Sequence, residues 1–210
     1  MGFVKASKEG KKYEKIAAKI NEYLDFMDAV GVNTSTVIDL NTVEFFTSHE
    51  GLHLPYEAAL TRVDSLTNEV YCTSAHFIWI GDRTRFVDSA HVEYCRGISN
   101  PIGIKCGPSL DPDELVKIIE TINPANEAGK ISLIFRYGEE SIDKHLPGLV
   151  ETITKNKKNV LWISDPMHGN TVKSSSGLKT RDFNSLLNET SKAIRTVSYT
   201  HLRAHETLRY

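Results

Sequence analysis

The chain has 210 residues, enough for one large domain or for part of one. Its 25 Lys and Arg residues against 27 Asp and Glu residues give a net charge of −2, which provides no broad basic field for nucleic acid. With 40% hydrophobic and 25% charged residues, the composition is globular and excludes an intrinsically disordered chain.

Membrane and secretory functions are not predicted. No apolar run approaches the 18 residues of a transmembrane helix, and the N-terminal sequence has no apolar stretch that could serve as a secretory signal. The three cysteines, Cys72, Cys95 and Cys106, lack metal-site spacing and fit reduced thiols better than disulfides. We therefore expect a soluble, cytoplasmic protein with no membrane or nucleic-acid partner.

Helical spacing first occurs between Lys11 and Val30. Its apolar residues recur at steps of three and four and share one face: Tyr13, Ile16, Ala17, Ile20, Tyr23, Leu24 and Met27. Gly31 can end this helix because glycine adopts the left-handed conformation without a Cβ clash.

Beyond this helix, short apolar runs alternate with helical patterns. Strands are predicted at Val43–Phe46, Phe77–Ile80, Ile102–Ile104, Ile131–Phe135 and Val160–Ile163. Helices are predicted at Pro55–Val63, Arg85–Ile98, Pro112–Ile122, Ile142–Ile153 and Asp182–Ile194. This alternation indicates βα units on a parallel sheet, with no linker that would mark an internal domain boundary.

The helix at Pro112–Ile122 has the clearest start signal. Asp111 can cap it, Pro112 suits its first turn, and Glu114 stands at the position of a capping-box carboxylate. Its buried stripe is predicted at every third or fourth position: Leu115, Ile118, Ile119 and Ile122.

Charged residues follow four of the predicted strands. Because ligands meet the carboxyl ends of parallel strands, these residues are expected to share one rim. The first strand is followed by Asp82 and Arg83 and the next three by Lys105, by Arg136, and by Asp165 with His168. Arginine and lysine suit phosphate and carboxylate groups, so the recurrence favours a phosphate-handling (β/α) barrel enzyme.

Each residue also has a purely structural interpretation. An Arg or Lys at a strand end is more often a solvated side chain or a surface ion pair, and a lone His such as His168 is more often hydrogen-bonded than metal-bound. His49 could cap the following helix or line the site, and Cys106 is interpreted as a small packing residue. Recurrence at four equivalent positions is what favours the functional interpretation.

Five blocks carry a resemblance to a known family: TSHEGLHLPYEAALTR (Thr47–Arg62), HFIWIGDRTR (His76–Arg85), NPIGIKCGPSL (Asn100–Leu110), FRYG (Phe135–Gly138) and WISDPMHGNT (Trp162–Thr171). They resemble, in the same order, type II 3-deoxy-D-arabino-heptulosonate 7-phosphate (DAHP) synthase. The resemblance spans residues 2–196 and implies a (β/α)8 barrel with an N-terminal extension. It also implies that phosphoenolpyruvate condenses with erythrose 4-phosphate and that phosphate is released. The resemblance further implies a requirement for a divalent metal, with Mn²⁺ preferred to Co²⁺ or another ion.

The resemblance also implies roles for individual residues. Arg83, Lys105 and Arg136 resemble the residues that hold the phosphate and carboxylate groups of the substrates, and Lys105 and Arg136 are also expected to act in catalysis. Asp82 resembles the acidic residue beside phosphoenolpyruvate, where many members have Glu, and Trp79 would wall that pocket. His168 resembles a metal ligand, and Asp165, in the same loop, is the third expected catalytic residue.

The sequence also departs from the family pattern. The family's metal site uses a Cys in a Gly-Asp-Cys-type motif, together with a Glu and an Asp from later strands, and these motifs are missing here. The early Gly-Arg-Met-Ala-Gly-type segment, which supplies another substrate-binding Arg, is missing too. We therefore expect residues 1–196 to form a partial (β/α)8 TIM barrel of about five strands, truncated at both ends and inactive alone. The full-length parent is expected to be a homo-oligomer.

Other interpretations stay open. The chain could belong to a secondary-metabolism variant of the synthase, or to a non-catalytic relic that binds phosphoenolpyruvate without turnover. Residues 197–210 are a separate matter, because VSYTHLRAHET (Val197–Thr207) resembles the translation of a transposon-end adapter used in sequencing libraries. We expect this tail to be non-native, the alternative being a polar helical tail, and assign no function to it.

Overall fold

The computed structural model describes residues 10–33, 36–37, 45–65 and 67–206. The chain divides into two compact units, residues 1–45 and 46–210, a division for which the sequence offers no linker signal. Among the described residues, no helix combines the length and the apolar character that crossing a bilayer requires.

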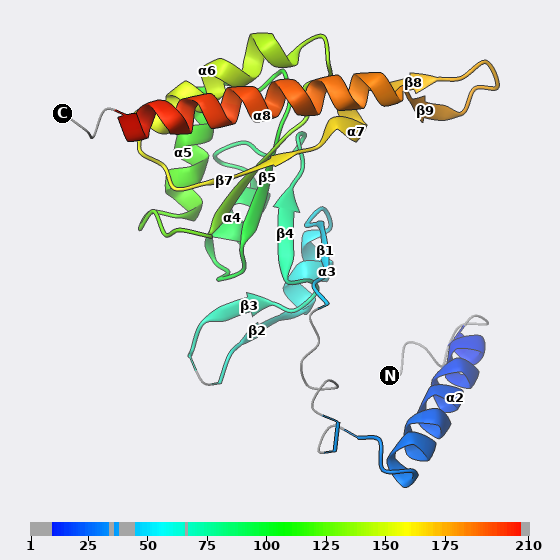
Figure 1. The fold of residues 1–210 in the computed structure, drawn as a ribbon. Coiled ribbons are helices and arrows are strands. Elements are labelled where there is room, and N and C mark those ends of the chain that lie inside the picture. The colour runs from blue at the N-terminus through cyan, green and yellow to red at the C-terminus, as the bar shows by residue number, and fades with distance from the viewer. Residues whose placement is uncertain (1–9, 34–35, 38–44, 66, 207–210) are drawn as a thin grey trace. The chain divides into compact units, whose positions relative to one another are not determined.

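The first unit contains helix α2 (Gly10–Ala29), which confirms the helix predicted there (Figure 1). Gly31 follows with a φ of +82°, as predicted for a residue that ends a helix. Its amide donates to the carbonyl of Asp28, and the amide of Val32 donates to that of Met27. The predicted strand at Val43–Phe46 begins outside the described residues, and its described part, residues 45–46, is not a strand.

A five-stranded parallel sheet forms the centre of the second unit (Figure 1). Its strands, in spatial order, are β1 (Ser48–Glu50), β4 (Phe77–Ile80), β5 (Ile102–Cys106), β6 (Ile131–Phe135) and β7 (Leu161–Ser164). Four of them match predicted strands to within two residues. The fifth, β1, was not predicted because Ser-His-Glu has no apolar pattern.

The helices that follow strands β4, β5, β6 and β7 lie in one layer. Strands that follow one another in a single direction, joined by right-handed crossovers, place all their connections on the same face of the sheet. In agreement, α5 packs against both α4 and α6, and α6 packs against α8. These helices are α4 (Ala90–Arg96), α5 (Pro112–Ile122), α6 (Ile142–Lys155) and α8 (Phe183–Glu206). The parallel α/β architecture is thus confirmed.

The core lies between the sheet and this helical layer. Ile78, Ile102, Ile104 and Leu133 are fully or almost fully buried on the sheet. The predicted stripe of α5 is buried against them, and Asp111 caps the helix by accepting from the amide of Asp113. Successive side chains of a strand point to opposite faces, so the residues between these buried ones lie on the sheet face away from the helices.

Two short hairpins and two short helices complete the second unit. They are α3 (Leu54–Ala59), β2 (Thr61–Val63), β3 (Val70–Cys72), α7 (Pro166–Gly169), β8 (Thr171–Lys173) and β9 (Lys179–Arg181). The predicted helix Pro55–Val63 is wrong beyond Ala59, because Thr61–Val63 pairs with β3 as an antiparallel strand. The helix predicted at Arg85–Ile98 starts only at Ala90, since the Ser89 hydroxyl caps it by accepting from the amide of Val92.

The last helix is longer than predicted. It was expected at Asp182–Ile194, but α8 continues through Val197 to Glu206. Helical structure therefore extends over most of the segment whose sequence resembles an adapter. The non-native origin of residues 197–210 stays a prediction.

Gly103 provides a test of packing on the sheet face that lies away from the helices. A Cβ placed there would lie 2.7 Å from Phe77, 2.8 Å from Ile134 and 2.9 Å from Trp79. Gly103→Ala is expected to lower the free energy of unfolding by about 1–3 kcal/mol, because overpacking displaces these side chains. Urea denaturation measures the change, and Gly148→Ala, where a Cβ meets open space, is the matched control. Gly148 lies inside α6, where alanine favours the helix, so its variant should keep or gain stability. A Gly103→Ala variant no less stable than wild type would contradict this packing.

Candidate active site

A pocket of about 430 Å³ opens at the carboxyl ends of the parallel strands. Every strand of the sheet, or the loop directly after it, contributes a side chain. The lining residues are Glu50, Trp79, Gly81, Asp82, Arg83, Lys105, Arg136 and His168. Six of these residues are ones that the sequence singled out, and five of the six are charged or can become charged.

The indole of Trp79 and the ammonium of Lys105 share one side of the pocket. Trp79 pairs in register with Gly103, and Lys105 comes two residues after Gly103, so both side chains project from the same sheet face. Lys105 Nζ lies 5.4 Å from the centre of the Trp79 ring, within the range of a cation–π contact. The glycine between them lets these two large side chains come together.

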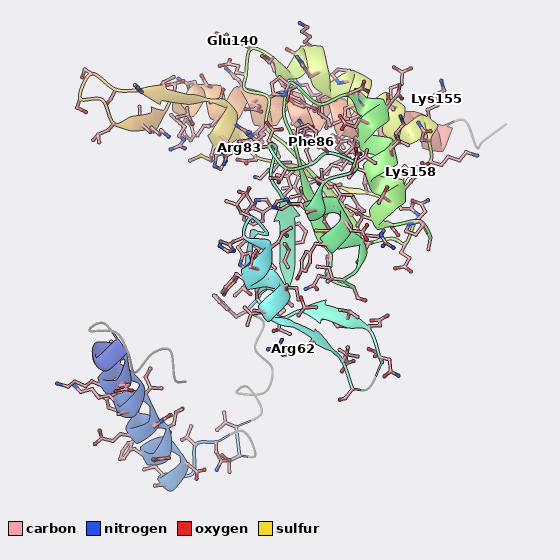
Figure 2. All side chains as sticks on the ribbon, turned by 180° about the vertical axis from the view of Figure 1, so that it is seen from behind. Arg62, Arg83, Phe86, Glu140, Lys155 and Lys158 are labelled. Carbon is pink, nitrogen blue, oxygen red and sulfur yellow. The ribbon has the colours of Figure 1, made fainter. Side chains whose placement is uncertain are left out.

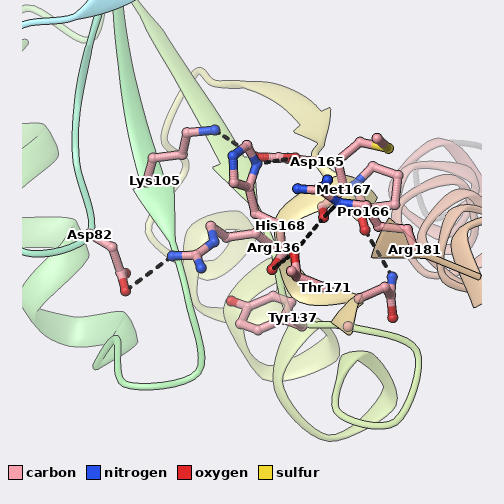
Figure 3. Close-up of polar contacts among 12 residues, drawn as sticks. Asp82, Lys105, Arg136, Tyr137, Asp165, Pro166, Met167, His168, Thr171 and Arg181 are labelled. Atoms are coloured by element: carbon pink, nitrogen blue, oxygen red, sulfur yellow. Dashed lines mark hydrogen bonds and ion pairs between the residues drawn. The ribbon is translucent and has the colours of Figure 1, made fainter. Parts of the chain in front are cut away.

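Asp82 lies between two arginines. Its Oδ1 accepts from Arg85 Nη2 at 2.8 Å and from Arg85 Nε at 3.1 Å, while Oδ2 lies 3.5 Å from Arg136 Nη1 (Figure 3). Arg85 is buried, with 3% of its surface exposed. Both Arg85 nitrogens donate to the same oxygen, and these charge-assisted hydrogen bonds hold the Asp82 carboxylate in place against Gly107.

Arg136 keeps unused hydrogen-bonding capacity. Its Nε is buried and has no hydrogen-bond partner among the residues that the structure describes. The contact with Asp82 is long, at 3.5 Å. A buried donor without a partner is costly, and the Arg136 side chain, which lines the pocket with 30% of its surface exposed, has further N–H groups for an anion. The guanidinium is therefore suited to bind a phosphate or a carboxylate.

Asp165 connects Lys105 to His168 (Figure 3). Lys105 Nζ donates to Asp165 Oδ2 at 2.6 Å, and His168 Nδ1 lies 2.8 Å from the same oxygen. Burial raises the pKa of Asp165, but the hydrogen bonds from Lys105 and His168 outweigh burial, so the pKa lies below its usual value. The carboxylate is thus ionised at neutral pH and orients both partners.

The site meets one requirement of a metal centre. A metal-binding histidine usually donates one ring N–H to a carboxylate and binds through its other nitrogen. With Nδ1 on Asp165, His168 leaves Nε2 available, and 60% of its side chain is exposed. Within the described ranges, however, no group of three His, Cys, Asp or Glu side chains is arranged to hold a metal. These residues therefore offer one oriented ligand.

Glu50 is a pocket residue that the sequence did not indicate. It ends β1, and its carboxylate lies against Gly81 in the next strand's loop. Neighbouring His49 neither caps α3 nor lines the pocket. It is instead 2.9 Å from Glu57, a carboxylate with only 2% exposure. A strand recognised at Ser48–Glu50 would have placed Glu50 at the rim with the other charged residues.

Two glycines bring the loops after β6 and β7 into contact. Gly138 has a φ of +83°, and a Cβ on it would lie 2.8 Å from the carbonyl oxygen of Gly169. A Cβ on Gly169 would in turn meet the backbone of Gly138. This approach places Arg136 and His168, which come from different loops, at the same pocket.

Comparison with known proteins identifies the family. The Class-II DAHP synthetase family matches residues 1–205. The chain belongs to this family. The match reaches residue 205 and so includes most of the adapter-like segment.

Three curated relatives agree with this assignment. A protein of Catharanthus roseus named "Probable phospho-2-dehydro-3-deoxyheptonate aldolase, chloroplastic" is 48% identical over 90% of this chain and 38% of its own length. Phospho-2-dehydro-3-deoxyheptonate aldolases of Streptomyces coelicolor and Neurospora crassa are 49% and 44% identical, over 89% and 93% of this chain. The chain spans about two fifths of the length of these relatives, 38–44%.

The structure brings together the residues that the DAHP synthetase resemblance pointed to. Trp79, Asp82, Arg83, Lys105, Arg136 and His168 all line the pocket. Asp165 does not line it but contacts two residues that do. Cys106, interpreted as a packing residue, is fully buried, and burial raises the pKa of its thiol to about 12.

Proposed function

We propose that this chain forms the phosphoenolpyruvate-binding part of a DAHP synthase, which condenses phosphoenolpyruvate with erythrose 4-phosphate. The observation that carries the proposal is the convergence of Arg83, Lys105 and Arg136 on one pocket at the strand ends, with a buried Arg136 Nε that lacks a partner. Phosphoenolpyruvate carries a phosphate and a carboxylate on a three-carbon skeleton. Three cations around one cavity suit a small ligand with two anionic groups.

Each side chain would have a distinct task in binding. Arg83 and Arg136 hold the anionic groups, since Arg83 forms no ion pair within the described part of the chain and the contact of Arg136 with Asp82 is long, at 3.5 Å. Lys105, held by Asp165, adds a fixed positive charge, and Trp79 covers the apolar carbon skeleton. Asp82, oriented by Arg85, keeps Arg136 directed toward the ligand and repels a wrongly placed anionic group.

The reaction explains why cations predominate. Carbon 3 of phosphoenolpyruvate attacks the aldehyde carbon, forming a carbon–carbon bond and placing negative charge on the aldehyde oxygen. Water then adds to carbon 2 and gives up a proton to the negatively charged oxygen that came from the aldehyde. The bond between carbon 2 and its phosphate oxygen breaks, inorganic phosphate leaves with that oxygen, and carbon 2 becomes a ketone carbonyl. Fixed cations stabilise the anionic groups throughout, at no cost of reorganisation during the reaction. A divalent metal, Mn²⁺ or Co²⁺ for example, would supply Lewis-acid polarisation of the aldehyde, with His168 Nε2 as one ligand.

The wider assignments belong to the same proposal. The five-stranded sheet is compatible with part of a (β/α)8 barrel, whose remaining strands would flank β1 and β7. The place in the shikimate pathway and a homo-oligomeric state are proposed from the family. A cytoplasmic location stays a prediction, and the Catharanthus relative is named as chloroplastic.

Binding of phosphoenolpyruvate to the 210-residue chain tests the proposal. Isothermal titration calorimetry is expected to detect binding that inorganic phosphate competes away. Lys105→Ala should weaken this binding about tenfold or more, because it removes a cation and leaves Asp165 without its ammonium partner. Lys158→Ala is the matched control: Lys158, labelled in Figure 2, pairs with Glu120 at 2.6 Å but lies before the amino end of β7, whereas the pocket residues follow the carboxyl ends of the strands. Equal effects of the two variants would contradict the proposal.

A further inference from the structure

Glu189, on helix α8, is a buried carboxylate that the proposed chemistry does not use. None of its surface is exposed. Its Oε1 accepts from the backbone amides of Tyr137 at 3.1 Å and Gly138 at 3.0 Å. Its Oε2 accepts from Asn170 Nδ2 at 2.5 Å. One side chain therefore contacts two separate loops.

Both loops carry residues of the candidate site. Tyr137 and Gly138 directly follow Arg136 after β6, and Asn170 comes two residues after His168. Asn170 extends the connection, because its Oδ1 accepts from the amide of Glu139 at 2.9 Å and its Nδ2 donates to the carbonyl of Pro166 at 2.9 Å. The carboxylate of Glu189 thus links the backbone of Tyr137 and Gly138 to the side chain of Asn170, on either side of the Gly138–Gly169 contact.

Stability alone is a poor reason for a carboxylate at this position. A buried carboxyl group loses its hydration, and in the described part of the chain no Lys, Arg or His forms an ion pair with Glu189. What compensates is a set of three N–H donors, all from the two site loops. An apolar side chain would pack here without that cost, but it would leave the loop amides unsatisfied.

We propose that Glu189 is a positioning residue, which holds the loops after β6 and β7 so that Arg136 and His168 face one pocket. This inference rests on the proposed function, because it assigns Glu189 to the binding of phosphoenolpyruvate through Arg136. Glu189 itself lies outside the pocket lining and acts only through the backbone and Asn170.

Two substitutions distinguish the contacts of Glu189 with the loop after β6 from its contact with the loop after β7. Glu189→Gln keeps one oxygen that can accept from the amides of Tyr137 and Gly138. Its –NH₂ group cannot accept from Asn170 Nδ2, so only the β7 loop is released. Glu189→Ala releases both loops. Glu140→Gln is the matched control, because it removes the same charge from an exposed position in the β6–α6 loop (Figure 2).

The experiment measures amide hydrogen exchange by NMR and phosphoenolpyruvate affinity by calorimetry on the 210-residue chain. In Glu189→Ala, the amides of Tyr137 and Gly138 should exchange at least tenfold faster, and phosphoenolpyruvate should bind at least tenfold more weakly. In Glu189→Gln, those amides and the affinity should stay within threefold of wild type, while the Glu139 amide, which reports on Asn170, exchanges at least tenfold faster. Glu140→Gln should match wild type in each measurement.

Contrary outcomes are distinguishable. If the amides of Glu189→Ala lose protection but its affinity stays within twofold, Glu189 is structural only, and the proposed function is unaffected. If both variants change the same amides equally, the division between the loops is wrong. If the wild-type chain binds no phosphoenolpyruvate, the proposed function fails, and the positioning of Arg136 for that ligand fails with it. Should Glu189→Ala not fold, Glu189→Asp, which withdraws both oxygens by one methylene and keeps the charge, must give the same losses.

Discussion

Replacing Arg136 by alanine is expected to weaken phosphoenolpyruvate binding to the chain at least tenfold. Arg136 directly follows β6, lines the pocket and has a buried Nε without a partner among the described residues. Losing a charge-assisted pair costs about 1.5–3 kcal/mol, and about 1.4 kcal/mol already corresponds to a factor of ten in affinity. Calorimetric titration of the variant with phosphoenolpyruvate measures the loss.

Two further variants test whether the loss of affinity depends on the guanidinium group of Arg136 itself. Arg136→Lys keeps the charge without the planar fork, so it should bind more weakly than wild type and more tightly than Arg136→Ala. Arg62→Ala removes an exposed arginine of the β2–β3 hairpin and should bind as wild type does (Figure 2). If Arg136→Ala kept the wild-type affinity, Arg136 would be a surface residue without a binding role.

The second large effect is an expected absence of turnover. The 210-residue chain, incubated with phosphoenolpyruvate, erythrose 4-phosphate and excess Mn²⁺, should release no phosphate. Among the described residues, His168 is an oriented ligand without two further His, Cys, Asp or Glu donors beside it. One imidazole binds a divalent metal too weakly to hold it against water and buffer. A coupled phosphate assay over several hours measures the rate.

This measurement also separates the interpretations of the chain. The full-length Streptomyces coelicolor relative is a suitable positive control. Metal-dependent phosphate release that disappears in His168→Ala would contradict the expectation and would mean that other residues of this chain complete a metal site. Binding of phosphoenolpyruvate without turnover is expected both for a segment of a synthase and for a non-catalytic relic. Activity restored in a longer form of the protein would favour the former.

The central part of the fold was predictable because its signals are local. Ile131–Phe135 is apolar at four of its five residues, and Asp111 with Pro112 marks the start of α5, so both elements were predicted with their bounds. The strand β1 was not predictable from pattern, because its three residues are polar and are held by pairing with β4. The sequence Thr61–Val63 continues a helical pattern, but these residues form a strand because they pair with β3. Tertiary pairing overrides local preference in both cases.

The candidate site was predictable for a different reason. Parallel strands deliver their following residues to one edge, so Lys105 and Arg136 could be placed together without coordinates. Contacts that depend on distant segments could not be placed in this way. Glu189 lies 52 residues from Tyr137 in sequence, and neither residue has a local pattern that points to the other. Likewise, Glu50 could be assigned to the pocket only once β1 was known.

The contact between Gly138 and Gly169 limits which sequences this rim can accept. Any other amino acid at either position brings a Cβ against the backbone of the other loop, and at Gly138 it must also adopt a positive φ. A larger residue at one position cannot be offset by a smaller one at its partner, because no residue is smaller than glycine. Substitutions of Gly138 and Gly169 are therefore not tolerated as long as the loops of Arg136 and His168 must meet, whatever ligand the pocket binds.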